Sequence, residues 1–226
     1  MSLKPKKFSE IKRSQEEMNT KMRRKTKVLL DELPPYTYIV CEGTKTEPNY
    51  FRGIAEEINN KYFDLSSGKR IVLKGTGRNT KGLLEYARKQ VEKDFPQAAT
   101  VWLVYDKDDF PLDNFDNTEY SALERSDVRR YKTAWSNECI ELWFLLHFQE
   151  LTVNIGREEY LHLLKKYCKY EKNMENIYEL LKDRMEEAIE RAKRQYEEYG
   201  DVAPSKKCPA TKVFQLVEEL KRYLQF

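Results

Sequence analysis

A strand that ends in a run of acids constrains this chain more than any other feature. Residues 101–105, VWLVY, are continuously apolar or aromatic, and Asp106, Asp108 and Asp109 follow directly. Such a run is typical of a strand that is buried on both faces of a parallel sheet. Ligands of open α/β sheets bind just beyond the carboxyl ends of such strands. Because crowded carboxylates repel one another, a hard divalent cation commonly neutralises them. The stretch therefore predicts a metal site at this sheet edge; an acidic, solvated loop is the alternative interpretation.

A second predicted strand ends in a similar way. Residues 36–41, YTYIVC, are mostly β-branched or aromatic, and the strand stops at Glu42. Gly43 then permits a sharp turn. Pro48 suits the first position of a helix that we expect over residues 49–60. Glu42 should therefore project from the carboxyl end of its strand.

The two strand ends together predict a constellation of acids. If the strands are neighbours, Glu42 converges with Asp106 and Asp108 on one point. An acid at one strand end and an Asp-x-Asp pair at another resemble a Toprim-type site. In such a site the aspartates hold Mg²⁺, and the glutamate is a further ligand or carries a proton.

Three blocks of sequence resemble the signature blocks of the RloB-like family. They are residues 41–51 (CEGTKTEPNYF), residues 104–110 (VYDKDDF) and residues 136–148 (SNECIELWFLLHF). A weaker match continues through residues 172–173, 188–193 and 209–211. Glu138 departs from the pattern, because proline is expected there in relatives. The resemblance implies a small bacterial protein with a Toprim-related core and a nuclease-like site, often encoded beside restriction or anti-phage systems.

Three further acids are auxiliary candidates. Glu47 lies about one turn beyond Glu42. It is either a ligand of a second metal ion or a hydrogen-bond partner of a metal ligand, or it stabilises the start of the following helix. Glu141 lies among apolar residues, where a carboxylate is costly unless it is paired or binds a cation. It therefore either pairs with a Lys or Arg of the core or reaches the site. Asp109 is the third auxiliary candidate.

A glycine-rich turn follows another short predicted strand, residues 70–73. Backbone amides at the start of the next helix, expected over residues 81–93, would hold a phosphate together with two basic side chains. The predicted phosphate-binding residues are Lys74, Gly75, Gly77 and Arg78. In the alternative interpretation this is a simple turn in which Asn79 or Thr80 caps the helix. The spacing is not that of a P-loop, so ATP hydrolysis is disfavoured.

Composition limits the remaining possibilities. The chain has four scattered cysteines and two histidines, so any metal should be hard and bound by oxygen, as Mg²⁺ or Mn²⁺ is. No apolar run is long enough to cross a bilayer and no signal-peptide pattern is present, so we expect a cytoplasmic protein without a membrane partner. Residues 1–27 carry ten basic and three acidic residues. This basic arm either contacts a phosphate backbone or is a solubilising tail.

Alternating strand and helix signals predict an α/β fold: a Toprim-like parallel-sheet core flanked by helices, with a C-terminal helical extension. The expected organisation is a basic arm over 1–34, the α/β domain over 35–150 and the extension over 151–226. Further predicted elements are a strand at 131–135, helices at 120–130, 138–148, 157–167, 172–199 and 210–224, and a loop at 111–117. The apolar stripe of helix 172–199 either packs on the body or forms a dimer seam, so the oligomeric state stays open.

The sequence favours a Mg²⁺- or Mn²⁺-dependent nuclease that acts on DNA or RNA. Its predicted catalytic and metal-binding residues are Glu42, Asp106 and Asp108. A non-catalytic nucleic-acid- or nucleotide-binding regulatory module is the first alternative, and a nucleotidyl transferase or primase-like enzyme is the second. Since the chain lacks a P-loop, any ATP hydrolysis would have to come from a separate partner, an ATPase or a restriction-system protein.

Overall fold

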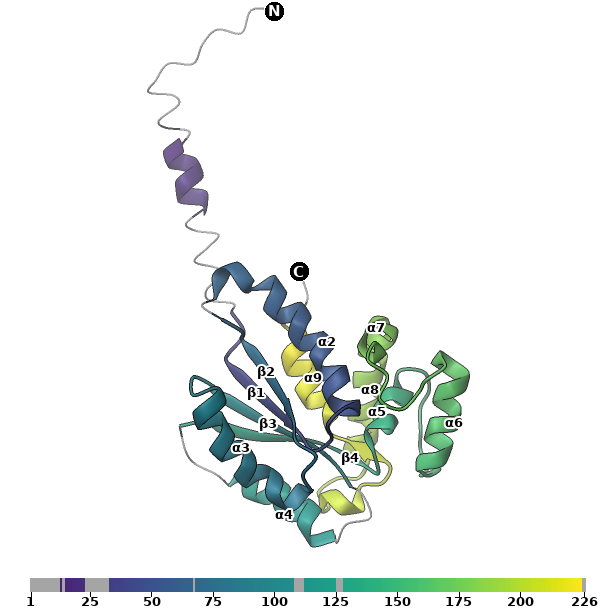
Figure 1. Ribbon diagram of the computed structural model, residues 1–226. Helices are drawn as coiled ribbons and strands as arrows, with labels where there is room; N and C mark the ends of the chain where they lie inside the picture. The colour runs from purple at the N-terminus through teal and green to yellow at the C-terminus, as the bar shows by residue number, and fades with distance from the viewer. Residues whose placement is uncertain are drawn as a thin grey trace, which may run out of the picture. The chain divides into compact units, whose positions relative to one another are not determined.

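The computed structural model describes most of the chain (Figure 1). The described residues are 13, 15–22, 33–66, 68–107, 112–124 and 128–224. The chain divides into two units, Met1–Pro34 and Pro35–Phe226. In the first unit residues 15–22 are helical with exposed side chains. Asp108 and Asp109, predicted to belong to the site, lie outside the described residues.

A five-stranded sheet organises the second unit, in the order β2-β1-β3-β4-β5. Its strands are β1 (Thr37–Cys41), β2 (Ile71–Gly75), β3 (Thr100–Asp106), β4 (Arg130–Asn137) and β5 (Ala210–Thr211). The first four are parallel, and β5 pairs antiparallel with β4. Helices flank this sheet, so the predicted α/β class is confirmed. Because β1 and β3 are neighbours, their carboxyl ends meet at one edge.

Helices cover both faces of the sheet. In Figure 1, α3 and α4 lie on one face, and α2, α5 and α9 lie on the other. The helices are α2 (Thr46–Lys61), α3 (Thr80–Asp94), α4 (Leu112–Leu123), α5 (Ile140–Leu146), α6 (Arg157–Cys168), α7 (Ile177–Leu181), α8 (Met185–Glu198) and α9 (Val213–Lys221). Short 3₁₀ turns span Phe63–Leu65, Lys182–Arg184 and Pro204–Lys206. No described helix combines the length and the apolar character needed to span a membrane.

Strand alternation decides which residues meet which helices. Tyr38 and Val40 of β1 and Leu103 and Tyr105 of β3 belong to one core cluster with Leu83 of α3. Successive strand residues point to opposite faces, so every second residue joins this cluster. At the ends of these two strands the alternation turns Glu42 toward α3 and Asp106 toward the opposite face.

Several element boundaries differ from the prediction. The α2 helix begins at Thr46, so Pro48 occupies its third position. Proline is tolerated there because the first amides of a helix have no partner within the helix. The predicted loop at 111–117 is wrong, since α4 begins at Leu112, and α4 ends at Leu123 rather than near residue 130.

The single helix predicted over 172–199 is also wrong. The chain forms α7, a 3₁₀ turn at Lys182–Arg184 and then α8. The two pieces pack on different partners: α7 contacts α2, whereas α8 contacts α5 and α9. At the α7 contact a Cβ on Gly53 would lie 2.3 Å from the Tyr178 ring. The helix predicted at 210–224 is shortened to α9, because Ala210–Thr211 pair with β4 as the edge strand β5.

Candidate active site

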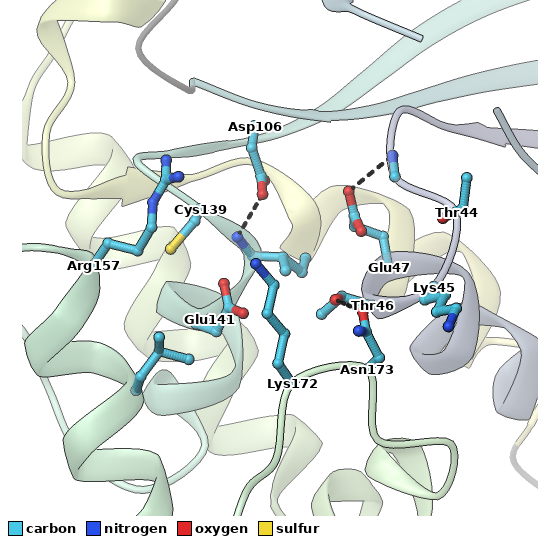
Figure 2. Close-up of a pocket in the computed structure, with 13 residues that line it drawn as sticks. Thr44, Lys45, Thr46, Glu47, Asp106, Cys139, Glu141, Arg157, Lys172 and Asn173 are labelled. Carbon is cyan, nitrogen blue, oxygen red and sulfur yellow. Dashed lines mark hydrogen bonds between the residues drawn. The ribbon is translucent and has the colours of Figure 1, made fainter. Parts of the chain in front are cut away.

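A cavity of about 240 Å³ opens where β3 ends and α2 and α5 begin (Figure 2). Loop residues 43–45, the first turns of α2, α5 and α6, and the loop after α6 supply its walls. Its charged lining residues are Lys45, Glu47, Asp106, Glu141, Arg157 and Lys172. Figure 2 shows the carboxylate of Asp106 pointing down into this space, with Glu141 below it and Glu47 to one side. The cavity therefore combines carboxylates with basic side chains.

Asp106 is the last residue of β3 and sits at the top of the cavity. Its Oδ2 accepts a hydrogen bond from the backbone N–H of Ile140 at 3.1 Å. Ile140 is the first residue of α5, whose leading amides have no partner within the helix. The chain reaches α5 from β4 through a cis peptide bond between Asn137 and Glu138. The hydrogen bond fixes the Asp106 carboxylate at the junction of sheet and helix.

Glu47 belongs to the first turn of α2 and is buried. Its Oε1 accepts a hydrogen bond from the backbone N–H of Gly43 at 3.2 Å. The chain bends at residues 42–45 between β1 and α2, where a turn at Gly43 was predicted, although the φ of Gly43 is not positive. A Cβ at position 43 would lie 2.3 Å from Oε2 of Glu47. A side chain at position 43 would therefore displace the Glu47 carboxylate.

Glu42 lies beside Asp106 but does not line the cavity. Both of its carboxylate oxygens accept hydrogen bonds from the Thr80 hydroxyl at 3.1 Å. Its Oε2 also accepts from the backbone N–H of Asp106 at 3.3 Å. The structure thus brings the ends of β1 and β3 together, with the Glu42 side chain turned toward the start of α3. Within the described part of the chain, no three His, Cys, Asp or Glu residues form a group that could hold a metal ion.

Glu141 is buried in the first turn of α5 and faces the cavity. The Tyr170 hydroxyl donates a hydrogen bond to its Oε1 at 3.1 Å. Burial and the adjacent Glu141 carboxylate raise the pKa of Tyr170, so the hydroxyl remains a donor. Burial, followed by the charges of Glu141 and Asp106, also raises the pKa of the Cys139 thiol. This thiol therefore stays protonated at neutral pH and is a poor nucleophile.

The sequence analysis gave no role to the three basic residues of the cavity, Lys45, Arg157 and Lys172. Arg157 is the first residue of α6, and Lys172 follows α6 in the loop that leads to α7. Figure 2 shows the Lys172 side chain extending toward Asp106 and Glu141, with Arg157 on the far side of Cys139. The weak family match at residues 172–173 was the available signal for this loop. The sequence around Arg157 did not indicate that this residue would lie near the carboxyl end of β3.

The loop that carries Lys172 is tied to the start of α2. The Thr46 hydroxyl donates to Oδ1 of Asn173 at 3.0 Å, and the Asn49 amide donates to the Asn173 carbonyl at 2.9 Å. Asn173 adopts a left-handed backbone conformation with φ of 66°. Asparagine tolerates this conformation better than most residues do. These contacts hold Lys172 over the cavity from a position 66 residues after Asp106 in the sequence.

The predicted phosphate-binding residues do not line this cavity. Lys74 and Gly75 line a neighbouring cavity of about 280 Å³ at the β2 edge, and Thr44 lines both cavities. Gly77 has a positive φ of 64° and donates its N–H to the Glu42 carbonyl at 2.8 Å. The guanidinium of Arg78 lies 4.6 Å from the centre of the Tyr86 ring. Asn79 caps α3 by accepting from Gly82, as the alternative interpretation expected.

Comparison with known proteins identifies the family. The family described as RloB-like protein matches residues 37–220, which include every described strand and all of the cavity lining. The chain therefore belongs to the RloB-like protein family. Neither the curated proteins nor the solved structures contain a match.

Proposed function

We propose that this protein is a Mg²⁺- or Mn²⁺-dependent nuclease, a phosphodiesterase that acts on DNA or RNA. One observation carries the proposal: Asp106, Glu47 and Glu141 line the same cavity as Arg157 and Lys172. Carboxylate oxygens are the ligands that Mg²⁺ and Mn²⁺ take in proteins. Guanidinium and ammonium groups bind the oxygens of a phosphodiester. The cavity thus contains both kinds of group that metal-assisted phosphoryl transfer requires.

The donor set fits a hard cation in its chemistry. Asp106 would hold the metal together with Asp108, which is two residues further along the chain. Glu47, Glu141 and Asp109 are auxiliary candidates for ligands or partners of ligands. The bound metal would polarise the scissile phosphate and stabilise charge on the attacking and leaving oxygens.

Other residues of the chain would position the reacting groups. Glu42 accepts hydrogen bonds from Thr80 and from the backbone of Asp106, which supports a role in holding the end of β3. It also remains the candidate for an additional ligand or proton carrier. Arg157 and Lys172 would bind the non-bridging phosphate oxygens and orient the scissile bond. Lys74 and Gly75, in the neighbouring cavity, would contact an adjacent phosphate.

A non-catalytic nucleic-acid- or nucleotide-binding module is the second candidate. The observation that favours it is the charge of the cavity, whose lining includes Lys45, Arg157 and Lys172 as well as its carboxylates. A phosphate group can bind such basic side chains without any metal. The family context of phage defence or restriction, with a separate ATPase or restriction-system partner, is compatible with either function.

Cleavage assays with matched variants test the proposal. The full-length protein is incubated with labelled single- and double-stranded DNA and RNA in Mg²⁺, Mn²⁺ or EDTA. We expect cleavage that requires the metal and is abolished by Asp106→Asn. The asparagine keeps an acceptor for the Ile140 N–H, so the melting temperature should not fall. Asp64→Asn, at an exposed position in the 3₁₀ turn Phe63–Leu65, is the control and should cleave normally.

The same assays distinguish the alternatives. Binding that persists in EDTA with no cleavage in any metal would refute the nuclease and support the binding module. Incorporation of a labelled nucleoside triphosphate into product would indicate a transferase instead. A Mn²⁺ titration adds a second readout, because Asp106→Asn should weaken Mn²⁺ binding whether or not the correct substrate has been found.

A further inference from the structure

A pair of stacked aromatic rings, Phe148 just after α5 and Tyr167 in α6, includes one exposed ring, that of Tyr167, and one partly buried ring, that of Phe148. The rings of Phe148 and Tyr167 are parallel, with an interplanar angle of 2° and centroids 4.9 Å apart. Tyr167 is 47% exposed although its ring is large and apolar. Its hydroxyl donates to the Gln149 side chain at 2.8 Å, which fixes the orientation of the ring. Tyr167 therefore presents an oriented aromatic ring to solvent, with the Phe148 ring stacked behind it.

One basic side chain contacts this stack, and three more are close to Tyr167 in the sequence. The guanidinium of Arg184 lies 5.3 Å from the centre of the Phe148 ring. Lys165 and Lys166 precede Tyr167 and Lys169 follows it, and all three lysines are exposed. An exposed aromatic ring with basic residues nearby is complementary to a partner that is both planar and anionic. Nucleobases joined by phosphates have that chemistry.

The stack is connected to the proposed active site by one helix. Arg157 and Leu161 of α6 line the cavity, and Lys172 lines it again just beyond the end of α6. Tyr167 follows Leu161 by six residues, which corresponds to about 9 Å along a helix axis. Six residues also turn the helix by about 600°, so Tyr167 lies about 120° around α6 from Leu161. A strand that leaves the cavity and crosses to that side of α6 would meet the aromatic pair within a short distance.

We propose that the Phe148–Tyr167 stack is a base-stacking platform that selects single-stranded nucleic acid. Stacking on an aromatic ring tolerates any base, because every base has a π face. In a duplex those faces are already covered by neighbouring bases. The lysines near Tyr167 would contact the backbone and contribute a salt-dependent, sequence-independent part of the affinity. This inference rests on the proposed action on nucleic acid and names the class of its substrate.

Oligonucleotide binding in EDTA tests the platform without requiring catalysis. Labelled single-stranded DNA and RNA, duplexes of the same sequence and a strand of abasic sites are titrated with the full-length protein. We expect the single strands to bind more tightly than the duplexes. Tyr167→Ala should weaken single-strand binding roughly five- to a hundred-fold and leave binding of the abasic strand unchanged. Tyr167→Phe, which keeps the ring, should bind as the wild type does.

Phe63→Ala provides the matched control. Phe63 is 75% exposed in a 3₁₀ turn and should not affect binding. Equal binding of wild type and Tyr167→Ala to single strands, or equal losses for the base-containing and abasic strands, would overturn the platform. Self-association that Tyr167→Ala abolishes, with no change in oligonucleotide binding, would show instead that a second copy of the chain covers the stack.

The platform and the proposed nuclease can fail separately. Cleavage that is lost in Asp106→Asn but unchanged in Tyr167→Ala, for single strands and duplexes alike, would retain the nuclease and reject the platform. Single-strand binding that depends on Tyr167 without cleavage in any metal would retain the platform and reject the nuclease.

Discussion

Replacing Lys212 should destabilise the protein more than most single substitutions. Lys212 forms an ion pair with Glu119 of α4, and both side chains are less than a tenth exposed. The same carboxylate accepts hydrogen bonds from Thr133 and from the Trp135 indole, the latter at 2.9 Å. Lys212→Met removes the ammonium and leaves Glu119 as an uncompensated buried charge. Breaking a buried pair in this way costs about 3–5 kcal/mol. The corresponding fall in Tm is roughly 6–20 °C for a domain of this size.

The double variant separates the charge effect from the loss of packing. Glu119→Gln combined with Lys212→Met removes both charges and keeps a side-chain oxygen as an acceptor for the Trp135 indole. We expect this double variant to lose less than about 2 kcal/mol and to be more stable than Lys212→Met alone. The free energy of unfolding is measured by urea titration, with a constant m-value as evidence that the same transition is observed.

An exposed ion pair on α3 is the control. Arg88 and Glu85 are 3.2 Å apart and partly exposed, so Glu85→Gln should change stability by less than about 1 kcal/mol. A cost below about 1 kcal/mol for Lys212→Met would refute the reasoning. A double variant that loses as much stability as Lys212→Met and Glu119→Gln lose together, when each is measured alone, would also refute it.

Two further predictions concern a buried histidine and the Glu47 carboxylate. Burial lowers the pKa of His147 to about 4, so between pH 6.5 and pH 4 the unfolded chain binds a proton that the folded chain does not. The free energy of unfolding should therefore fall by about 2 kcal/mol between pH 7 and pH 5. His147→Phe should flatten this pH dependence. Equal pH dependence of the unfolding free energy in wild type and variant would contradict the assignment to His147. Gly43→Ala would place a Cβ 2.3 Å from Glu47 and displace its carboxylate. If Glu47 assists metal binding, Mn²⁺ affinity should fall roughly ten-fold or more with little loss of stability, whereas unchanged affinity would exclude that role.

The sequence was most informative where one strand and the residues directly after it were enough for a prediction. Two apolar runs that end in acids predicted a parallel sheet with Glu42 and Asp106 at one edge, and the structure places these residues side by side. The sequence did not show toward which face of the sheet each carboxylate points. Glu42 lies on the same face of the sheet as Val40, and Asp106 lies on the face opposite to Tyr105. Only the packing of α3 against Val40 and Tyr105 shows which of the two faces this helix covers.

Long-range contacts account for the remaining differences. The edge strand Ala210–Thr211 is two residues long, too short to produce an alternating pattern. The division between α7 and α8 falls at Lys182–Arg184, among good helix formers, because the two helices pack on different partners. Arg157 and Lys172 look like ordinary charges on a solvated surface, and only the folded chain brings them opposite Asp106.

The hydrogen bonds from Thr46 and Asn49 to Asn173 have a consequence for any shortened form of this protein. A chain that stopped before residue 157 would lack Arg157 and Lys172 of the cavity, and also α8 and α9, which pack on α5 and β4. The repulsion among its acids would then lack the counter-charges that Arg157 and Lys172 provide. If the cavity binds phosphates as proposed, such a fragment should bind them less tightly than the full chain does, because two of the three basic side chains that line the cavity would be missing.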